Sequence, residues 1–363
     1  MIFLSVGFPG RFAAWCEGVV AQLVGALGGS VSKLAWPSIE ELTRIWPIPG
    51  ALEIIAHRLI EATSDHLVVG LHQPDDRLLA ALSAAGVRFL VALDDPRAAV
   101  ADILAETGSE LGLATRAVAN CCPLIMQFVA LPGALALHAN AARADPGAAV
   151  VAIAGHLGLN LSRPRTRRIA ERIAASELTR ALASAPAAAA LSTPAQRVVD
   201  GALAGYAELF GGGVLDQIVW RREIFILHSE GFVRPTGIID VAGPPRVLIY
   251  GPYIHLPPGR WSARIILGVS PDAAGNSFLI DAFADTRQLG HSVLVPTAGG
   301  VHAADIDFSL DEPSAKGLEI RVLVTNQKPR GRLALGQVVL QPLAVRQPDA
   351  FSGSEAFEAV LDL

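Results

Sequence analysis

A change in the hydrophobic pattern near residue 215 constrains the fold of this 363-residue chain more than any other feature. Before it, continuous apolar runs alternate with segments of helical periodicity. After it, short alternating or β-branched runs are separated by clusters of proline, glycine, asparagine and aspartate. The first pattern is typical of a parallel sheet covered on both faces by helices, and the second is typical of a β-sandwich. We therefore predict an α/β domain followed by an all-β domain of jelly-roll type.

The α/β half is expected to alternate strands and helices. The pattern predicts strands at residues 2–8, 66–72, 87–93 and 134–138, and helices at residues 12–27, 75–85, 97–106 and 145–157. The long apolar region 117–142 is interrupted by Asn120, Pro123, Pro132 and His138. Because a membrane-spanning helix needs about 20 mostly unbroken apolar residues, we interpret this region as a buried helix followed by a strand.

We predict four parts along the chain. Residues 1–165 form the α/β domain, 166–214 a helical connector, 215–345 the β-sandwich and 346–363 a tail. Strands of the sandwich are expected at residues 219–227, 247–250, 261–269, 277–283, 304–310, 318–325 and 336–340. Arg163, Arg165, Arg167 and Arg168 stand at the boundary between the α/β domain and the connector, where they either contact an anionic partner or form a solvated helix face.

Composition narrows the classes of function. The 52% hydrophobic content excludes wholesale disorder, and a net charge of −5 without a long basic run gives no electrostatic footprint for nucleic acid. Cys16, Cys121 and Cys122 have no spacing that suits a metal or a disulfide framework, and no basic segment precedes the apolar N-terminus. We therefore expect a bacterial, cytoplasmic protein with no metal site, no membrane span and no nucleic-acid partner. Its abundance of arginine over lysine and of alanine is typical of GC-rich genomes.

The first candidate site is the loop that joins the first strand to the first helix, Gly7-Phe8-Pro9-Gly10-Arg11. Free N–H groups and the dipole at a helix N-terminus favour an anion such as phosphate. The loop lacks the second glycine, the lysine and the hydroxyl of the P-loop signature. If the protein is a working transferase, backbone N–H groups of Gly7–Ala14 and Arg11 are expected to hold the anion.

This loop resembles the one with which sulfotransferases hold 3′-phosphoadenosine-5′-phosphosulfate, of pattern aromatic-Pro-basic-Ser-Gly-Thr-Thr. Phe8-Pro9 matches its start, while Gly10, Arg11, Phe12, Ala13 and Ala14 replace the residues that follow. Leu93-Asp94-Asp95-Pro96-Arg97 is similar to the family's strand-ending Arg-Asp-Pro-Arg, and residues 137–159 are similar to its closing strand and helix. Leu71-His72-Gln73-Pro74 resembles Lys-Thr-His-x-Pro, in which the histidine is the catalytic base, although Gly70 replaces the lysine.

The resemblance covers residues 1–165 and implies a sulfotransferase-like P-loop fold. It implies His72 as catalytic base and Gly10, Arg11, Phe12, Ala13 and Arg97 as the residues nearest the cofactor, in vestigial or weak form. Asp94 and Asp102 stand where the family binds the 3′-phosphate with Arg and Ser.

These departures act against the reaction. Sulfuryl transfer needs preorganised cations and N–H donors, whereas like charges about 4 Å apart repel by about 1–4 kcal/mol. Arg11 and Arg97 offset part of this repulsion if they turn inward. We expect no cofactor, and 3′-phosphoadenosine-5′-phosphosulfate only if the protein is an active transferase. His72 is then either the base or a hydrogen-bonded structural residue, and Asp94-Asp95 either caps the next helix or holds a cation.

A second candidate site lies in the β half, between Tyr250 and Trp261. This segment also holds Tyr253, His255 and Arg260 in a chain poor in aromatic residues. Aromatic faces stack on sugars while polar side chains satisfy their hydroxyls. The segment resembles the Tyr-Gly-Pro-Tyr hairpin of jelly-roll modules attached to bacterial surface-polysaccharide enzymes, and this resemblance covers residues 216–342.

The aromatic residues of this segment have two possible roles. Tyr250, Tyr253, His255 and Trp261 are candidates for carbohydrate binding, and the alternative for Tyr250 and Trp261 is a place in the core. Asp281 and Arg321 lie on apolar strands, where they form an inter-strand pair or line a concave face.

The predicted function is that of a non-catalytic or atypical sulfotransferase-like protein. Its β-sandwich recognises a glycan in the synthesis or modification of bacterial surface polysaccharide. One alternative is an active sulfuryl or other group transferase that acts on a glycan with His72 as base. Another is a scaffolding protein with protein partners or a homo-oligomer.

Overall fold

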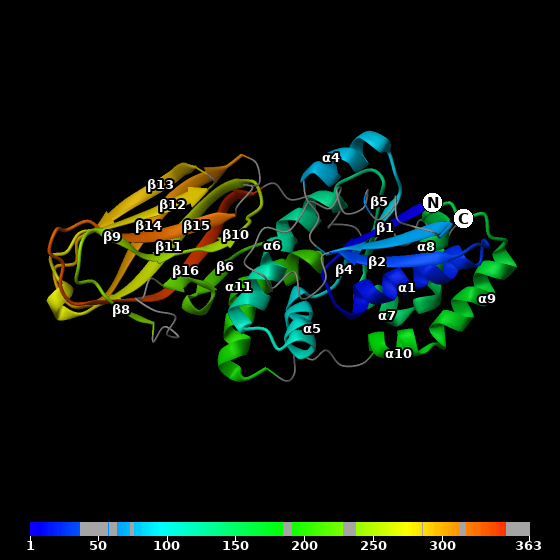
Figure 1. Ribbon diagram of the computed structural model, residues 1–363, viewed down its shortest axis with the longest axis horizontal. Helices are drawn as coiled ribbons and strands as arrows, with labels where there is room; N and C mark the ends of the chain where they lie inside the picture. The colour runs from blue at the N-terminus through cyan, green and yellow to red at the C-terminus, as the bar shows by residue number, and fades with distance from the viewer. Residues whose placement is uncertain are drawn as a thin grey trace.

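The computed structural model describes residues 1–36, 57, 64–72, 76–183, 191–227, 237–284, 286–311 and 317–345. It contains a parallel sheet with helices on both faces and two antiparallel sheets packed as a sandwich, as the hydrophobic patterns predict (Figure 1). The predicted tail at residues 346–363 lies outside the described residues. None of the helices within the described ranges is long and apolar enough to cross a membrane.

The sheet of the α/β half has the strand order β2-β3-β1-β4-β5, with every neighbouring pair parallel. Its strands are β1 (Ile2–Gly7), β2 (Val31–Trp36), β3 (His66–Leu71), β4 (Phe89–Leu93) and β5 (Ala134–His138). Strands β3 and β4 are buried along their whole length, because helices cover both faces of a parallel sheet. The central strand β1 separates β3 from β4, so the loops after β1 and β4 lie side by side at the carboxyl edge.

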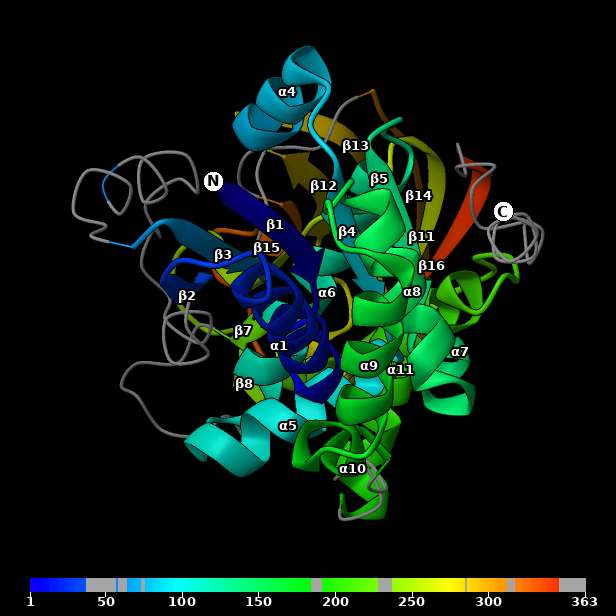
Figure 2. The ribbon, with the colours of Figure 1, turned by 90° about the vertical axis from the view of Figure 1, so that its right-hand side faces the viewer.

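Two layers of helices enclose this sheet. One layer packs on the face that carries Phe3, Val68 and Leu90, and it contains α1 (Arg11–Gly25), α7 (Ala139–Ala144), α8 (Pro146–His156), α9 (Arg163–Ala174) and α10 (Glu177–Ala183). The other layer contains α4 (Asp76–Ala85), α5 (Pro96–Thr107), α6 (Leu111–Val129) and α11 (Thr193–Phe210). Figure 2 views this half end-on, with the sandwich behind it.

The segment predicted as a helical connector is divided between the two layers. Helices α9 and α10 pack on α1 and α8, whereas α11 packs on α5, α6 and the first strand of the sandwich. The same helices therefore complete the α/β half and carry the chain into the β half.

The β half consists of two antiparallel sheets. One has the order β13-β12-β15-β9-β7, with β10 added beside β15, and the other has the order β14-β11-β16-β6, with β8 added beside β16. Their bounds are β6 Ile218–Arg221, β7 Ile226–Leu227, β8 Ile238–Asp240, β9 Arg246–Tyr250, β10 Pro252–Ile254, β11 Gly259–Val269, β12 Phe278–Ala284, β13 Arg287–Leu294, β14 Gly300–Leu310, β15 Leu318–Val324 and β16 Arg332–Val345. Single turns η2 (Arg222–Ile224) and η3 (Pro271–Ala273) connect some of them.

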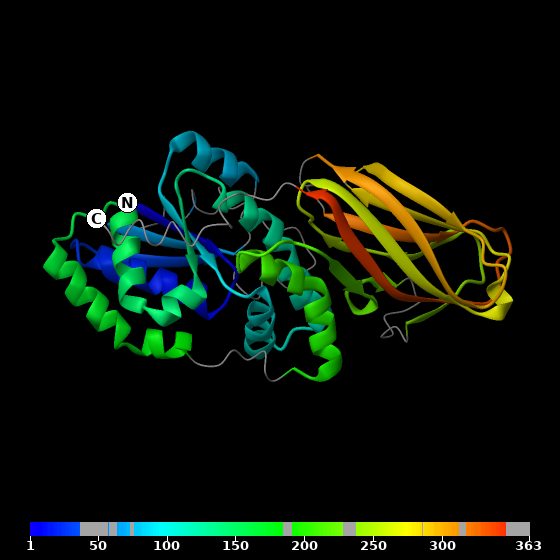
Figure 3. The same ribbon diagram turned by 180° about the vertical axis from the view of Figure 1, so that it is seen from behind.

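The two halves share one continuous hydrophobic core. Trp220, Ile224 and Phe225 of the sandwich belong to the same buried cluster as the apolar faces of α6 and α11. At the start of α6, Gly112 lies so close to the carbonyl oxygen of Glu223 that a Cβ there would collide with it. The junction therefore consists of direct packing between helices and strands (Figures 1 and 3).

This close approach makes Gly112 a test of the shared core. We expect Gly112→Ala to lower the free energy of unfolding by about 1–3 kcal/mol, because the added methyl group forces backbone apart at the junction. Gly155→Ala is the matched control, since a Cβ on this helical residue meets nothing within 4 Å. It is expected to leave stability unchanged or raise it by up to about 1 kcal/mol. Urea unfolding measures both, and equal stabilities of the two variants would contradict the packing described.

Candidate functional site

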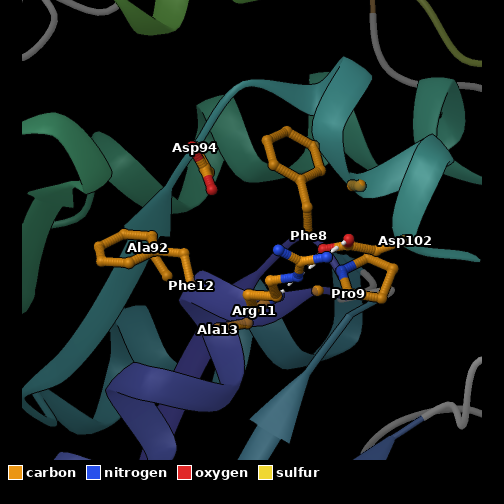
Figure 4. A pocket seen from close by; sticks show the side chains of 10 residues that line it. Phe8, Pro9, Arg11, Phe12, Ala13, Ala92, Asp94 and Asp102 are labelled. Carbon is orange, nitrogen blue, oxygen red and sulfur yellow. Dashed lines mark hydrogen bonds and ion pairs between the residues drawn. The ribbon is translucent and has the colours of Figure 1, made fainter. Parts of the chain in front are cut away.

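The loop between β1 and α1 borders a small pocket at the carboxyl edge of the parallel sheet (Figure 4). The residues that line it are Phe8, Pro9, Gly10, Arg11, Phe12, Ala13, Ala92, Asp94, Ala99 and Asp102. The structure thus brings together four of the five predicted cofactor residues, Arg97 being the exception. Gly10 has a φ of 147°, which permits the turn from the strand into the helix. The cavity has a volume of only about 10 Å³, which is about the room that one water molecule needs.

A side chain of the protein itself fills the anion position of this loop. The Asp102 carboxylate on α5 accepts a hydrogen bond from the backbone N–H of Arg11, over 3.3 Å to Oδ2. The Arg11 side chain lies across the same carboxylate, with Nε 3.4 Å from Oδ1, as Figure 4 shows. Arg11 therefore meets the condition for offsetting part of the repulsion, because it turns inward and pairs with Asp102. The negative charge that a helix N-terminus favours is already present.

Arg97, the other cation predicted for this site, is paired with carboxylates outside the pocket. Arg97 forms a two-pronged ion pair with Asp95, with distances of 2.9 Å (Nε–Oδ1) and 2.6 Å (Nη2–Oδ2), and lies 3.6 Å from Asp200 of α11. These carboxylates raise the pKa of Arg97. Asp95 also accepts from the backbone N–H of Arg97, over 2.9 Å, and so caps α5. Of the two roles predicted for this aspartate, the structure shows the helix cap.

Asp94 is neutralised from the opposite helix layer. Its carboxylate receives two hydrogen bonds from Nη2 of Arg143 on α7, over 2.9 and 3.1 Å. Burial raises the pKa of Asp94, and the Arg143 guanidinium opposes that rise. Among the residues that the structure describes, no group of three or more His, Cys, Asp or Glu side chains is placed to hold a metal ion.

His72 lies at the end of β3, where the motif places it, but it is buried below the loop. Its Nδ1 is 3.2 Å from the carbonyl oxygen of Gly7, so the neutral ring donates this proton and directs Nε2 toward Glu17 of α1. The nearest Glu17 oxygen is 4.0 Å from Nε2. Burial lowers the pKa of His72 to about 4 and raises that of Glu17 to about 7. His72 is not among the residues that line the pocket.

Glu17 is the residue of this region that the motifs do not identify. Its carboxyl group occupies the space above Gly70, where any Cβ would collide with it. A larger side chain at position 70 would therefore displace the Glu17 carboxyl group. The signal in the sequence is a single carboxylate inside an otherwise apolar stretch of α1, Phe12–Val20.

A second polar cluster lies on the outer face of the β13-β12-β15-β9 sheet. Asp281 and Arg321 are directly opposite each other on β12 and β15, and they form the predicted inter-strand pair with distances of 2.8 and 2.6 Å. Gln288 of β13 donates to the same carboxylate over 3.3 Å, and the Arg321 guanidinium lies 3.9 Å above the centre of the Phe283 ring. Asp281 is buried beneath this face, whereas its partner Arg321 is only half-buried and reaches the surface.

The two predicted tyrosines adjoin this pair. The Tyr253 hydroxyl donates to Glu319 over 3.0 Å, and its ring lies edge-to-face with that of Tyr250, with centroids 6.5 Å apart. Burial and the Glu319 carboxylate raise the pKa of Tyr253. Both rings are half-buried. The surface formed by Tyr250, Tyr253, Asp281, Phe283, Gln288, Glu319 and Arg321 is called the sandwich face below.

The remaining two predicted carbohydrate-binding residues have other positions. Trp261 is fully buried between the sheets, and its Nε1 donates to the carbonyl oxygen of Pro257 over 3.0 Å. It therefore belongs to the core, one of its two predicted roles, and offers no ring face to a ligand. The backbone N–H of His255 donates to the side chain of Asn120 on α6 over 2.8 Å, which places His255 at the junction of the two halves.

No motif of the sequence points to Phe283, Gln288 and Glu319 as members of this cluster. Phe283 and Glu319 alternate with inward apolar residues on β12 and β15, and this alternation is the signal that identifies an outer face.

Comparisons with known proteins give distant resemblances. No protein-family model and no curated protein matches the chain. A mouse sulfotransferase solved with PAP has a TM-score of 0.37 and 11% identity over 55% of this chain and 81% of its own. A CBM6 module of LamC from Zobellia galactanivorans has a TM-score of 0.26 and 13% identity over 35% of this chain and 99% of its own. A Stig cyclase of a Fischerella species has a TM-score of 0.21 and 12% identity over 28% of this chain, and the chain spans 56% of that cyclase.

The buried Glu17 makes stability depend on pH. Its pKa of about 7 in the folded state lies above the ordinary 4.5, so the folded state loses stability as pH rises from 4.5 through 7. His72 acts in the opposite direction, because its lowered pKa costs stability as pH falls from 6.5 toward 4. We expect Glu17→Gln to be more stable than the wild type by on the order of 2 kcal/mol at pH 8 and by much less at pH 5. Urea unfolding at both pH values measures this. A difference that is the same at pH 5 and pH 8 would contradict the assignment.

Proposed function

We propose that the protein recognises a glycan on the sandwich face and that its α/β half is a sulfotransferase-like scaffold without transferase activity. We place this role in the synthesis or modification of bacterial surface polysaccharide. The observation that carries the proposal is the sandwich face itself, on which half-buried aromatic rings adjoin a hydrogen-bonded set of charged and amide groups.

The chemistry of the sandwich face suits a sugar. Tyrosine rings offer apolar faces that pack on sugar C–H groups, while carboxylate, guanidinium and amide groups exchange hydrogen bonds with hydroxyls. Tyr253 holds Glu319, and the buried Asp281 holds Arg321, so the orientation of Glu319 and Arg321 is fixed before a ligand arrives. Because neighbouring strands lie about 4.8 Å apart, groups on β13, β12, β15 and β10 form a row that an extended oligosaccharide can follow across the sheet.

The contacts of the α/β half support its proposed role as a scaffold without transferase activity. A transferase of this type must bind an anionic donor at the β1–α1 loop and neutralise the charge that develops during transfer. The Asp102 carboxylate takes that position, and Arg97 and Arg143 are committed to Asp95 and Asp94. His72, the predicted base, is buried against Gly7 and Glu17. An active transferase would require Asp102 to leave the loop and His72 to become accessible.

The test of glycan recognition is a glycan array followed by calorimetric titration of the best ligand. We expect Tyr253→Ala to weaken binding by about 1–3 kcal/mol, the usual loss when an aromatic platform for a ring ligand is removed. Tyr253→Phe keeps the ring and removes only the hydrogen bond to Glu319, so it serves as the matched control and should retain most of the affinity.

Thermal unfolding of both variants verifies that each is folded. Unchanged affinity in Tyr253→Ala, or the absence of any glycan that binds the wild type, would make the proposal wrong.

A further inference from the structure

The exposed surface of α9 carries a concentration of positive charge that the proposed function does not use. Arg163, Arg165, Arg167, Arg168 and Arg172 are all exposed, while the opposite face of the helix is buried against α8 and α1. This occurs in a chain whose net charge is −5. The local charge is therefore opposite in sign to that of the molecule.

Three of these arginines form a line. Arg165, Arg168 and Arg172 are three and four residues apart, so they follow one ridge of the helix at axial spacings of about 4.5 and 6 Å. Within the described part of the chain, no ion pair joins these three to a carboxylate, whereas Arg167 pairs with Glu171 over 3.0 Å. Arg168 donates to the carbonyl oxygen of Pro164 over 3.3 Å. We call Arg165, Arg168 and Arg172 the arginine ridge.

The arrangement is unfavourable for the isolated fold. Cations in the first turns of a helix oppose its dipole, and like charges three or four residues apart repel each other. The first turn of α9 contains no acidic residue to offset this. Arg88 adds another exposed cation at the end of α8, where it donates to the carbonyl oxygen of His156 over 3.0 Å. A partner with repeated negative charges removes both costs.

We propose that the arginine ridge binds an acidic polysaccharide, one with carboxylate or sulfate groups repeated along the chain. Guanidinium groups match such anions with paired hydrogen bonds. The exposed face of α9 has no aromatic ring for nucleic-acid bases and no large aliphatic side chain for a lipid surface, because Ile169 and Ile173 are buried and only Pro164 and Ala174 are exposed apolar residues. This choice of partner rests on the proposed function, since a glycan-recognising protein meets such polymers.

The ridge and the sandwich face are separate sites. Figures 1 and 3 show α9 at one end of the molecule and strands β12 and β13 toward the other. A substitution in one site therefore leaves the contacts of the other unchanged, and each can be tested alone.

The test measures binding of the full chain to polygalacturonate and to dextran sulfate, with neutral dextran as the uncharged reference, in 50 and 200 mM salt. The test variant is Arg165→Gln/Arg168→Gln/Arg172→Gln. Arg260→Gln/Arg264→Gln/Arg332→Gln is the matched control, because it removes the same charge from exposed positions on β11 and β16. Thermal unfolding establishes that both variants are folded.

We expect the wild type to bind at least one of the two polyanions and not the neutral polymer. The ridge variant should bind roughly tenfold more weakly at low salt, with a slope of log K against log salt that is smaller by about 2. The control should behave as the wild type does. Equal loss in the two variants, unchanged binding in the ridge variant, or no polyanion binding by the wild type would overturn the proposal.

Two further measurements distinguish this proposal from other classes of partner and from the function proposed for the sandwich face. Tighter ridge-dependent binding of the wild type to duplex DNA or to anionic lipid vesicles would assign the ridge to another class of partner and overturn the choice of polysaccharide. Tyr253→Ala should retain polyanion binding. If no neutral glycan binds the wild type but polyanions bind through the ridge, the function proposed for the sandwich face fails and the ridge stands.

Discussion

The hydrogen bond from the N-terminus of α1 to the Asp102 carboxylate is the interaction on which the structure of the β1–α1 loop depends. A helix that follows a buried strand at the carboxyl edge of a parallel sheet presents free N–H groups and a positive dipole to whatever lies there. Here the anion comes from α5 of the same chain. This contact stabilises the loop without a ligand and leaves a pocket with room for about one water molecule.

Further carboxylates around the loop also have partners within the α/β half. Asp94 at the end of β4 is paired with Arg143 of α7, and Asp102 of α5 is paired with Arg11 of α1. The Glu17 carboxyl of α1 lies against Gly70 of β3. These contacts link α1, α5 and α7 to one another and to the sheet.

Helix α6 connects this half to the sandwich. Its buried face belongs to the core that also contains Trp220 and Phe225, and its Asn120 holds the backbone of His255. On the same helix, the Cys121 thiol donates to the carbonyl oxygen of His72 over 2.8 Å. The end of β3 and the Tyr250–Trp261 segment are therefore both hydrogen-bonded to α6, which links the sandwich face to the α/β half.

The sequence predicts the main strands well, because a strand buried on both faces must be continuously apolar, as in β1, β3 and β4. It does not predict β2, whose sequence Val-Ser-Lys-Leu-Ala-Trp mixes polar and apolar residues because it lies at the edge of the sheet. It also does not predict β13, another edge strand, with largely exposed residues. The motifs locate the β1–α1 loop, but the partner of its N–H groups depends on how α5 packs, which local sequence does not specify. The same holds for Trp261, since only the packing of the two sheets decides whether a ring on a strand points inward.

A calorimetric titration with adenosine 3′,5′-bisphosphate, run on the whole protein and on the variant Asp102→Ser, tests whether Asp102 occupies the anion position of the loop. If the Asp102 carboxylate is the anion of the loop, the wild type gives no heat of binding at millimolar ligand. The variant, with the N–H groups of α1 released, then shows weak binding that is lost when Arg11→Ala is added. Micromolar binding to the wild type would show that Asp102 does not block the loop. It would also favour a donor-binding transferase domain in the α/β half.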